Sequence, residues 1–125
     1  MKATLLLAAS IVLAAHAATA ARAPDPCGKL SNETREAARS LAACITTGMC
    51  DSALQEREFS NNEGILPKSA LNQRYMEARV GAARDDSGGV KRLVFLVQGT
   101  RGGSSEAVLE KYYTGDHYRS FCRVR

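Results

Sequence analysis

The sequence predicts an α+β fold, with an N-terminal helix packed on a twisted antiparallel β-sheet. Between residues 32 and 45, small and apolar residues recur at helical spacing. Further along the chain the pattern changes to short alternating or apolar runs of strand length, separated by turns rich in Gly, Ser and Asp. A helix followed by a run of strands with short connections favours the α+β class and an antiparallel sheet.

The first twenty residues are typical of a secretory signal peptide. Lys2 provides a positive start, residues 3–15 are almost uniformly apolar, and residues 18–20 are small enough for a cleavage site near residue 20. The apolar run is too short to remain as a membrane-spanning helix. We therefore expect a secreted protein, extracellular or periplasmic, whose residues 21–125 form a single domain without a membrane anchor.

The remaining chain is mildly basic. Lys2 is the one basic side chain lost with the first twenty residues, so 16 of 17 basic and all 13 acidic side chains remain. A small positive excess is compatible with an anionic substrate, although many small proteins share it.

All four cysteines lie beyond residue 20, at positions 27, 44, 50 and 122. An even number of cysteines in a small exported chain predicts two disulfides. A zinc site is the alternative, but it would need cysteines separated by two to four residues, and this spacing does not occur. Of the three pairings, we favour Cys44–Cys50 with Cys27–Cys122.

The elements follow in order. Residues 21–30 hold two prolines and a glycine and should be an extended arm. A helix should run from about Asn32 to Ile45, capped by Ser31 or Asn32 and ended near Gly48. The expected strands are 75–80, 90–97, 107–113 and 118–125.

Three side chains in the strand region have types that could perform acid–base chemistry on a phosphate ester. Glu77 and Arg79 lie on the strand face opposite to its apolar residues, and Arg92 lies in the most apolar strand. A guanidinium there usually has an anionic partner or ligand. His117 is the sole histidine beyond residue 20. A carboxylate, an imidazole and a guanidinium could serve as base, acid and phosphate clamp. A solvated sheet glutamate and a surface histidine are the alternatives.

Four segments resemble one family of enzymes. The end of the chain, YYTGDHYRSF (112–121), resembles the C-terminal signature of the barnase-type guanyl-preferring ribonucleases. FSNNEGILP (59–67) resembles the family's guanine-recognition loop, and YMEARV (75–80) and VKRLVF (90–95) resemble its two catalytic strands. The segments follow the family's order at nearly its spacing.

The resemblance implies a microbial ribonuclease fold and a role for each matching residue. Glu77 would be the general base that removes the proton from the ribose 2′-hydroxyl, His117 the general acid, and Arg92 the phosphate clamp. Tyr118 would border the phosphate. The guanine base would be bound by backbone amides and the Glu63 carboxylate of a loop that comprises Phe59, Ser60, Asn61, Asn62 and Glu63. The products would be 2′,3′-cyclic phosphates, with no metal or other cofactor.

The sequence departs from the family at two site positions. The family's second active-site arginine lies about four residues before Arg92, where this chain has Ser87 or Gly88. Arg84 lies nearby and could reach the site from its loop. Asn62 stands where the family usually has arginine. These departures concern substrate affinity and rate more than fold or reaction type.

The resemblance also implies partners. RNA would be the substrate of a monomeric enzyme, and a barstar-like cytoplasmic inhibitor would protect the producing cell.

Two other functions are alternatives to an active ribonuclease. The first alternative is a catalytically weakened or inactive relative that binds RNA or a protein partner. The second is an unrelated disulfide-stapled inhibitor or interaction module.

Overall fold

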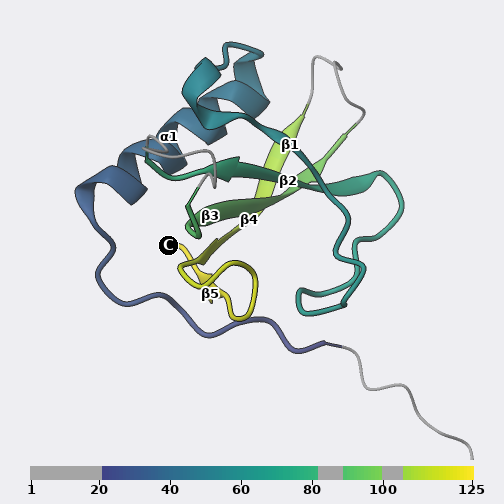
Figure 1. The fold of residues 1–125 in the computed structure, drawn as a ribbon. Coiled ribbons are helices and arrows are strands. Elements are labelled where there is room, and N and C mark those ends of the chain that lie inside the picture. Colours follow the sequence, from purple (N-terminus) through teal and green to yellow (C-terminus); the bar gives the residue numbers. More distant parts are fainter. Residues whose placement is uncertain (1–20, 82–88, 100–105) are drawn as a thin grey trace, which may run out of the picture.

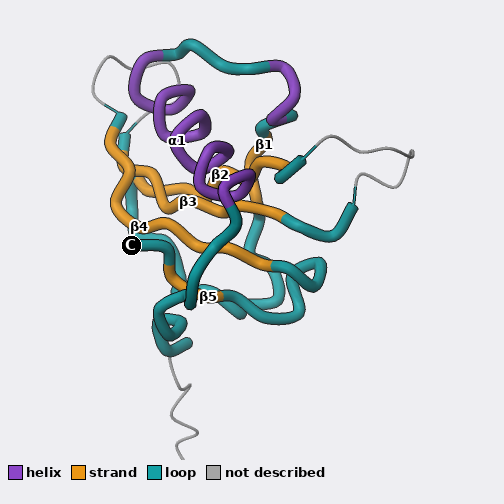
Figure 2. The backbone as a smooth tube through the Cα atoms, turned by 90° about the vertical axis from the view of Figure 1, so that its left-hand side faces the viewer, coloured by secondary structure: helices purple, strands orange, loops and turns teal. Residues whose placement is uncertain are grey.

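The predicted α+β architecture is confirmed. The computed structural model describes residues 21–81, 89–99 and 106–125, so the expected signal segment, residues 1–20, lies outside the described residues. Helix α1 (Asn32–Thr47) lies on one face of a five-stranded antiparallel sheet with the strand order β1-β2-β3-β4-β5 (Figures 1 and 2). The strands are β1 (Arg57–Phe59), β2 (Gln73–Arg79), β3 (Arg92–Gln98), β4 (Ala107–Thr114) and β5 (Cys122–Arg123). A short 3-10 helix, η1 (Ser52–Leu54), precedes β1.

Helix α1 begins and ends where its capping residues require. The Ser31 hydroxyl accepts a hydrogen bond from the Thr34 amide at 3.1 Å and satisfies one of the first free N–H groups. At the other end, Gly48 adopts φ 75° and donates its amide to the Cys44 carbonyl, which closes the last turn. The helix therefore continues two residues beyond the expected end at Ile45.

The sheet separates two groups of buried side chains, because successive residues of a strand point to opposite faces. The group under α1 is the larger. It contains Leu41 and Ile45 of the helix, Val80 just after β2, and Met76, Ala78, Leu93, Phe95 and Val97 of the sheet. The opposite face carries a smaller group, which comprises Leu66, Tyr75, Val94 and Tyr112. Glu77 and Arg92 share this second face, so they lie away from the helix.

The structure corrects two expectations about strands. The prediction of a strand over 118–125 was wrong in extent, because strand pairing here is confined to β5. Before it, His117 and Tyr118 adopt φ angles of 57° and 70°, which are incompatible with an extended strand. Strand β1 was not expected, since three residues are too few to show an alternating pattern.

Both favoured disulfides, Cys27–Cys122 and Cys44–Cys50, are present. The first fastens the N-terminal arm to β5, where the Cys27 amide also donates to the Arg123 carbonyl at 2.8 Å. Figure 1 shows this arm crossing the end of the fold that carries β5. Among the described helices, none is long and apolar enough to cross a membrane.

Candidate active site

Glu77 lies at the centre of the helix-free face of the sheet. The residue is 3 % exposed, so its carboxylate needs hydrogen-bond partners. Arg57, its register partner on β1, donates Nε to Oε1. The Tyr118 hydroxyl donates to Oε2 at 2.6 Å. Both carboxylate oxygens are therefore bound, one by a donor from β1 and the other by a donor from the loop between β4 and β5.

Three arginines surround this carboxylate. Arg57, Arg79 and Arg92 line a cavity of about 250 Å³ together with Glu77. The remaining lining residues are Gln55, Glu56 and Ala78. The three guanidinium groups come from three adjacent strands, β1, β2 and β3. The cavity therefore combines one buried carboxylate with a cluster of positive charge.

Arg92 is the most buried of the three arginines, at 5 % exposure. Its Nη1 donates to the carbonyls of Gly89 at 3.0 Å and Lys91 at 2.9 Å, which directs the guanidinium along the start of β3. Across the sheet it is the direct register partner of Arg79. Two like charges face each other at this position.

The charges around Tyr118 affect its ionisation in opposite directions. Burial raises the pKa of its hydroxyl, and the hydrogen bond to Glu77 and the negative charge of that residue raise it further. The positive charges of Arg57 and Arg92 act in the other direction. Glu77 in turn raises the pKa of Arg57, chiefly through their hydrogen bond. Tyr118 is therefore a neutral donor and Arg57 a permanent cation at neutral pH.

His117 lies at the rim of this face, in the loop between β4 and β5. Its side chain is exposed, its amide donates to the Val90 carbonyl at 3.1 Å, and its ring centroid is 5.0 Å from that of Tyr118. Within the described chain, no hydrogen bond joins it to Glu77. The imidazole is thus accessible to solvent and beside the ring of Tyr118, whose hydroxyl binds Glu77.

Asp116 organises the loop that carries His117. Its carboxylate accepts hydrogen bonds from the Thr114 hydroxyl, at 2.9 Å, and from the amide and hydroxyl of Ser120. These bonds, with the Ser120 hydroxyl contributing most, lower the pKa of Asp116 to about 2. The Thr114 hydroxyl also accepts from the Tyr118 amide at 3.1 Å. The loop conformation that places His117 and Tyr118 is therefore held by an ionised carboxylate.

A second cavity of about 170 Å³ is linked to the first by one hydrogen bond, because Tyr118 lines the second cavity and binds Glu77 of the first. Its lining contains all five expected base-loop residues, namely Phe59, Ser60, Asn61, Asn62 and Glu63, together with Ile65 and Tyr118. The Phe59 and Tyr118 rings, which both line the second cavity, stack at 5.3 Å. The base loop and the carboxylate site are thus neighbours.

The base loop is closed by one side chain. Asn61 donates Nδ2 to the Leu66 carbonyl at 2.9 Å and accepts from the Leu66 amide at 3.1 Å. Its own carbonyl accepts from the Gly64 amide, so Asn62 and Glu63 occupy the centre of a tight turn. Asn61 therefore shapes this pocket from within, while Glu63 is exposed at its rim.

The expected site residues are only partly brought together. Glu77, Arg92 and Tyr118 meet on one face, and the base loop lies beside them. Arg84 lies outside the described residues, as do Ser87 and Gly88. Sequence reasoning missed Arg57, which binds Glu77 directly. The signal that could have found it is the pairing of β1 with β2, which a three-residue strand does not reveal by periodicity.

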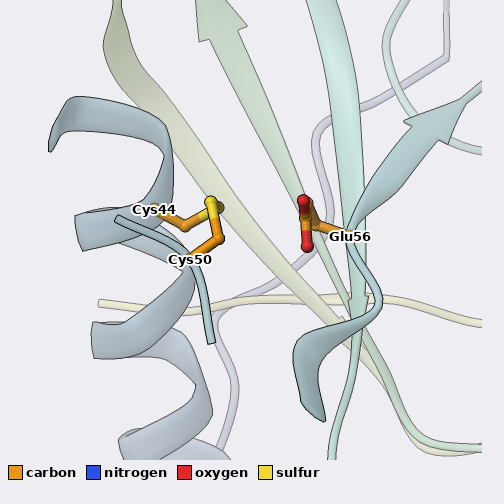
Figure 3. A group of neighbouring side chains, drawn as sticks. All are labelled: Cys44, Cys50 and Glu56. Carbon is orange, nitrogen blue, oxygen red and sulfur yellow. A yellow bond between two sulfur atoms is a disulfide. The ribbon is translucent and has the colours of Figure 1, made fainter. Parts of the chain in front are cut away.

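One further cluster has ligand types suited to a metal. Cys44, Cys50 and Glu56 have ligand atoms within 4.8 Å of one another. Figure 3 shows Cys44 on α1 and Cys50 on the segment after it, joined through their sulfur atoms, with Glu56 nearby. Metal coordination by cysteine requires thiolates. The disulfide therefore removes two of the three ligands.

The sequence was compared with known proteins. A family model described as ribonuclease matches residues 14–125. No curated protein matches the chain.

Proposed function

Since the chain belongs to the ribonuclease family, we propose that it is a secreted endoribonuclease that cleaves single-stranded RNA 3′ of guanosine through a 2′,3′-cyclic phosphate. Membership of the ribonuclease family supports RNA cleavage as the general activity of this chain. The observation that supports the finer proposal is the setting of Glu77, a buried carboxylate with three arginines around one cavity. A proton acceptor beside clustered guanidinium groups is the arrangement that an attack on a phosphodiester needs.

In the proposed first step, Glu77 removes the proton from the ribose 2′-hydroxyl. The 2′-oxygen then forms a bond to phosphorus, the bond from phosphorus to the 5′-oxygen breaks, and His117 protonates the departing oxygen. Water opens the cyclic phosphate in a second step, with the two proton transfers reversed. The nucleophile belongs to the substrate, so the protein needs to supply only proton transfer and electrostatic stabilisation.

The positions of the charged groups support these roles. Glu77 is bound by Arg57 and Tyr118, whose donors hold its carboxylate in the cavity. Arg92 would neutralise charge that develops on the phosphate. His117 is exposed beside Tyr118, where it can exchange protons with a leaving group and with solvent.

The proposed guanine preference rests on the base loop. The Glu63 carboxylate would accept hydrogen bonds from two N–H donors on the edge of guanine, a pattern that adenine does not offer. Backbone amides of the loop from Phe59 to Asn62 would bind the opposite acceptors. Among the described residues, the Asn62 and Glu63 amides donate to no protein acceptor. A pocket built to pair with these groups disfavours a base that leaves them unpaired.

Secretion, a monomeric state and a barstar-like cytoplasmic inhibitor belong to the same proposal. The two disulfides support an oxidising compartment. An active ribonuclease inside its producing cell would destroy RNA there, which is the reason to expect an inhibitor before export.

The test is cleavage of four short oligoribonucleotides, each with one different base at a fixed position, in the presence of EDTA. We expect cleavage after G alone, with a 2′,3′-cyclic phosphate end identified by mass spectrometry. A substrate with a 2′-deoxy sugar at that position is the matched control and should stay intact. Absence of cleavage by correctly oxidised protein would reject the catalytic proposal in favour of an inactive RNA-binding relative.

A further inference from the structure

We propose that Arg57 and Arg79 complete a three-arginine phosphate site with Arg92. As a statement about catalysis this inference rests on the proposed function. As a statement about phosphate binding it can be tested separately. The three residues line one cavity with Glu77, although they are separated by up to 35 positions in the sequence.

The position of Arg57 fits a residue that contacts substrate. Its side chain is 68 % exposed, whereas that of its partner Glu77 is 4 % exposed. The arginine of this ion pair is therefore accessible to a ligand from solvent. Its hydrogen bond to the Glu77 carboxylate is made by Nε of the guanidinium. A guanidinium has five N–H donors in a planar fork, so Nη atoms remain suited to a phosphate oxygen.

Arg57 also occupies the carboxylate oxygen that the proposed base would use. Tyr118 binds the other oxygen, so both are engaged in the free protein. A bound phosphate diester would compete with Glu77 for the exposed guanidinium and draw it toward the cavity. Oxygen Oε1 would then be able to accept the 2′-hydroxyl proton. Arg57 would bind the phosphate and release the base in one movement.

Arg79 provides the second, independent argument. It faces Arg92 directly across the β2–β3 ladder on the same side of the sheet. Like charges at opposed positions of an antiparallel pair are destabilising. Within the described part of the chain, the side chain of Arg79 makes no hydrogen bond or ion pair with another residue. An anion in the cavity would convert this repulsion into a two-sided clamp.

The charges of the cavity agree with an anionic ligand. Three arginines face two carboxylates, Glu56 and Glu77, among the lining residues. The surplus is one positive charge, which matches the single negative charge of an RNA phosphodiester. Because Glu77 is held by the neutral Tyr118 hydroxyl as well, it retains a partner when Arg57 turns to the phosphate.

The experiment measures inorganic phosphate binding to the full oxidised protein by nuclear magnetic resonance of the arginine Nε–Hε groups at low ionic strength. The variants are Arg57→Gln and Arg79→Gln. The matched control is Arg39→Gln, which removes the same charge from an exposed helix position paired with Glu36. We expect each site variant to weaken phosphate binding at least about tenfold and the control to change it less than about twofold.

Kinetics with a G-containing oligonucleotide provides the second measurement. Each site variant should lower kcat/KM by about 10- to 100-fold, in line with loss of a transition-state donor. The Arg57→Lys variant should recover part of the phosphate affinity, because it restores the charge without the planar fork. Urea unfolding of each variant identifies any that fail to fold. If Arg57→Gln does not fold, Arg79→Gln carries the test, because it removes a charge from the same cavity and leaves the bond between Arg57 and Glu77 in place.

The outcomes separate the two proposals. If the wild-type protein cleaves RNA but both glutamine variants bind phosphate as it does, the three-arginine site is rejected and the proposed function stands. If the wild-type protein binds phosphate but cleaves no RNA, and the Arg57→Gln or Arg79→Gln variant loses phosphate binding, the anion site stands and the proposed reaction is rejected. If the wild-type protein shows no phosphate-dependent shift of these arginines, the anion site is rejected directly.

Discussion

The two disulfides close loops of very different length, and this difference predicts how much each contributes to stability. Cys27 and Cys122 are 95 positions apart, whereas Cys44 and Cys50 are 6 apart. A cross-link stabilises mainly by restricting the unfolded chain, and the chain-entropy relation gives about 4.7 kcal/mol for the long loop and about 2.2 kcal/mol for the short one. Replacing both cysteines of the long loop by alanine should therefore be the more damaging change.

Contacts in the folded protein add to the loop-closure values, and they add more for the short loop than for the long one. Cys44 is buried in the core under α1, so its replacement by alanine also removes packing contacts, which costs about 1 kcal/mol more. Cys27 and Cys122 are only half-buried, and the arm keeps its backbone hydrogen bonds to Arg123. The expected losses are then about 5 and about 3 kcal/mol, with the order unchanged.

The assay is equilibrium urea unfolding of the two double variants and the wild-type protein, followed by far-ultraviolet circular dichroism. Free energies must be compared rather than midpoints, because removal of a cross-link exposes more surface in the unfolded state and raises the slope. A Cys44→Ala/Cys50→Ala variant as unstable as the Cys27→Ala/Cys122→Ala variant would refute the reasoning from loop length. The stabilising effect of the Cys27–Cys122 disulfide would then have to come from contacts in the folded protein and not from loop length.

Four further predictions concern the site. Glu77→Gln and His117→Ala should each lower kcat/KM by at least about 100-fold without unfolding the protein, because each removes a proton-transfer group. A His117→Ala variant with full activity would end the proposed mechanism. Cleavage should show a bell-shaped dependence on pH, since Glu77 must be ionised and His117 protonated, and a flat profile from about pH 4 to about pH 9 would contradict this pair. Tyr118→Phe should destabilise the protein by about 1.5–3 kcal/mol in urea, the typical value of a hydrogen bond to a charged group, and an unchanged midpoint would show that the bond at 2.6 Å contributes nothing. Asp116→Asn should lower stability at pH 7. The native pKa of Asp116, about 2, lies below the unfolded value of about 3.9. Its stabilising contribution is therefore present above about pH 4 and is lost as the pH falls toward 2. Urea unfolding should show a lower free energy of unfolding for Asp116→Asn than for the wild-type protein at pH 7, and similar values for the two proteins at pH 2.

The parts of the fold that the sequence predicted well are those with periodic patterns. Helix α1 and strands β2, β3 and β4 are long enough for alternation or helical spacing to show, and the structure places them within two residues of the expected boundaries at most ends. Residues 118–121 of the loop between β4 and β5 were predicted as part of a strand because Tyr118 and Phe121 have strand-forming side chains. Its true conformation depends on the Asp116 hydrogen bonds, which no periodic pattern reports.

The site was predictable to the extent that its residues lie on long strands. Alternation along β2 placed Glu77 and Arg79 on one face, and the apolar surroundings of Arg92 indicated a paired cation. Arg57 could not be found this way, because its closeness to Glu77 results from the register between β1 and β2 across 20 positions of sequence. The resemblance to a known family did not indicate Arg57 either, since it directed attention to the loop before β3.

The division of the sheet into two faces has a consequence for how such a protein can change over evolutionary time. Along β2 and β3, one set of alternate positions holds the core under α1. The other set contributes to the smaller buried group and, at Glu77, Arg79 and Arg92, lines the cavity. A mutation on the cavity side alters charge without disturbing the packing of residues such as Phe95. Any position that lines the cavity can then supply the positive charge that a phosphate needs. An arginine lost from one strand or loop can be replaced by an arginine on a neighbouring strand. Related enzymes could therefore retain one chemistry while their arginines occupy positions that do not align.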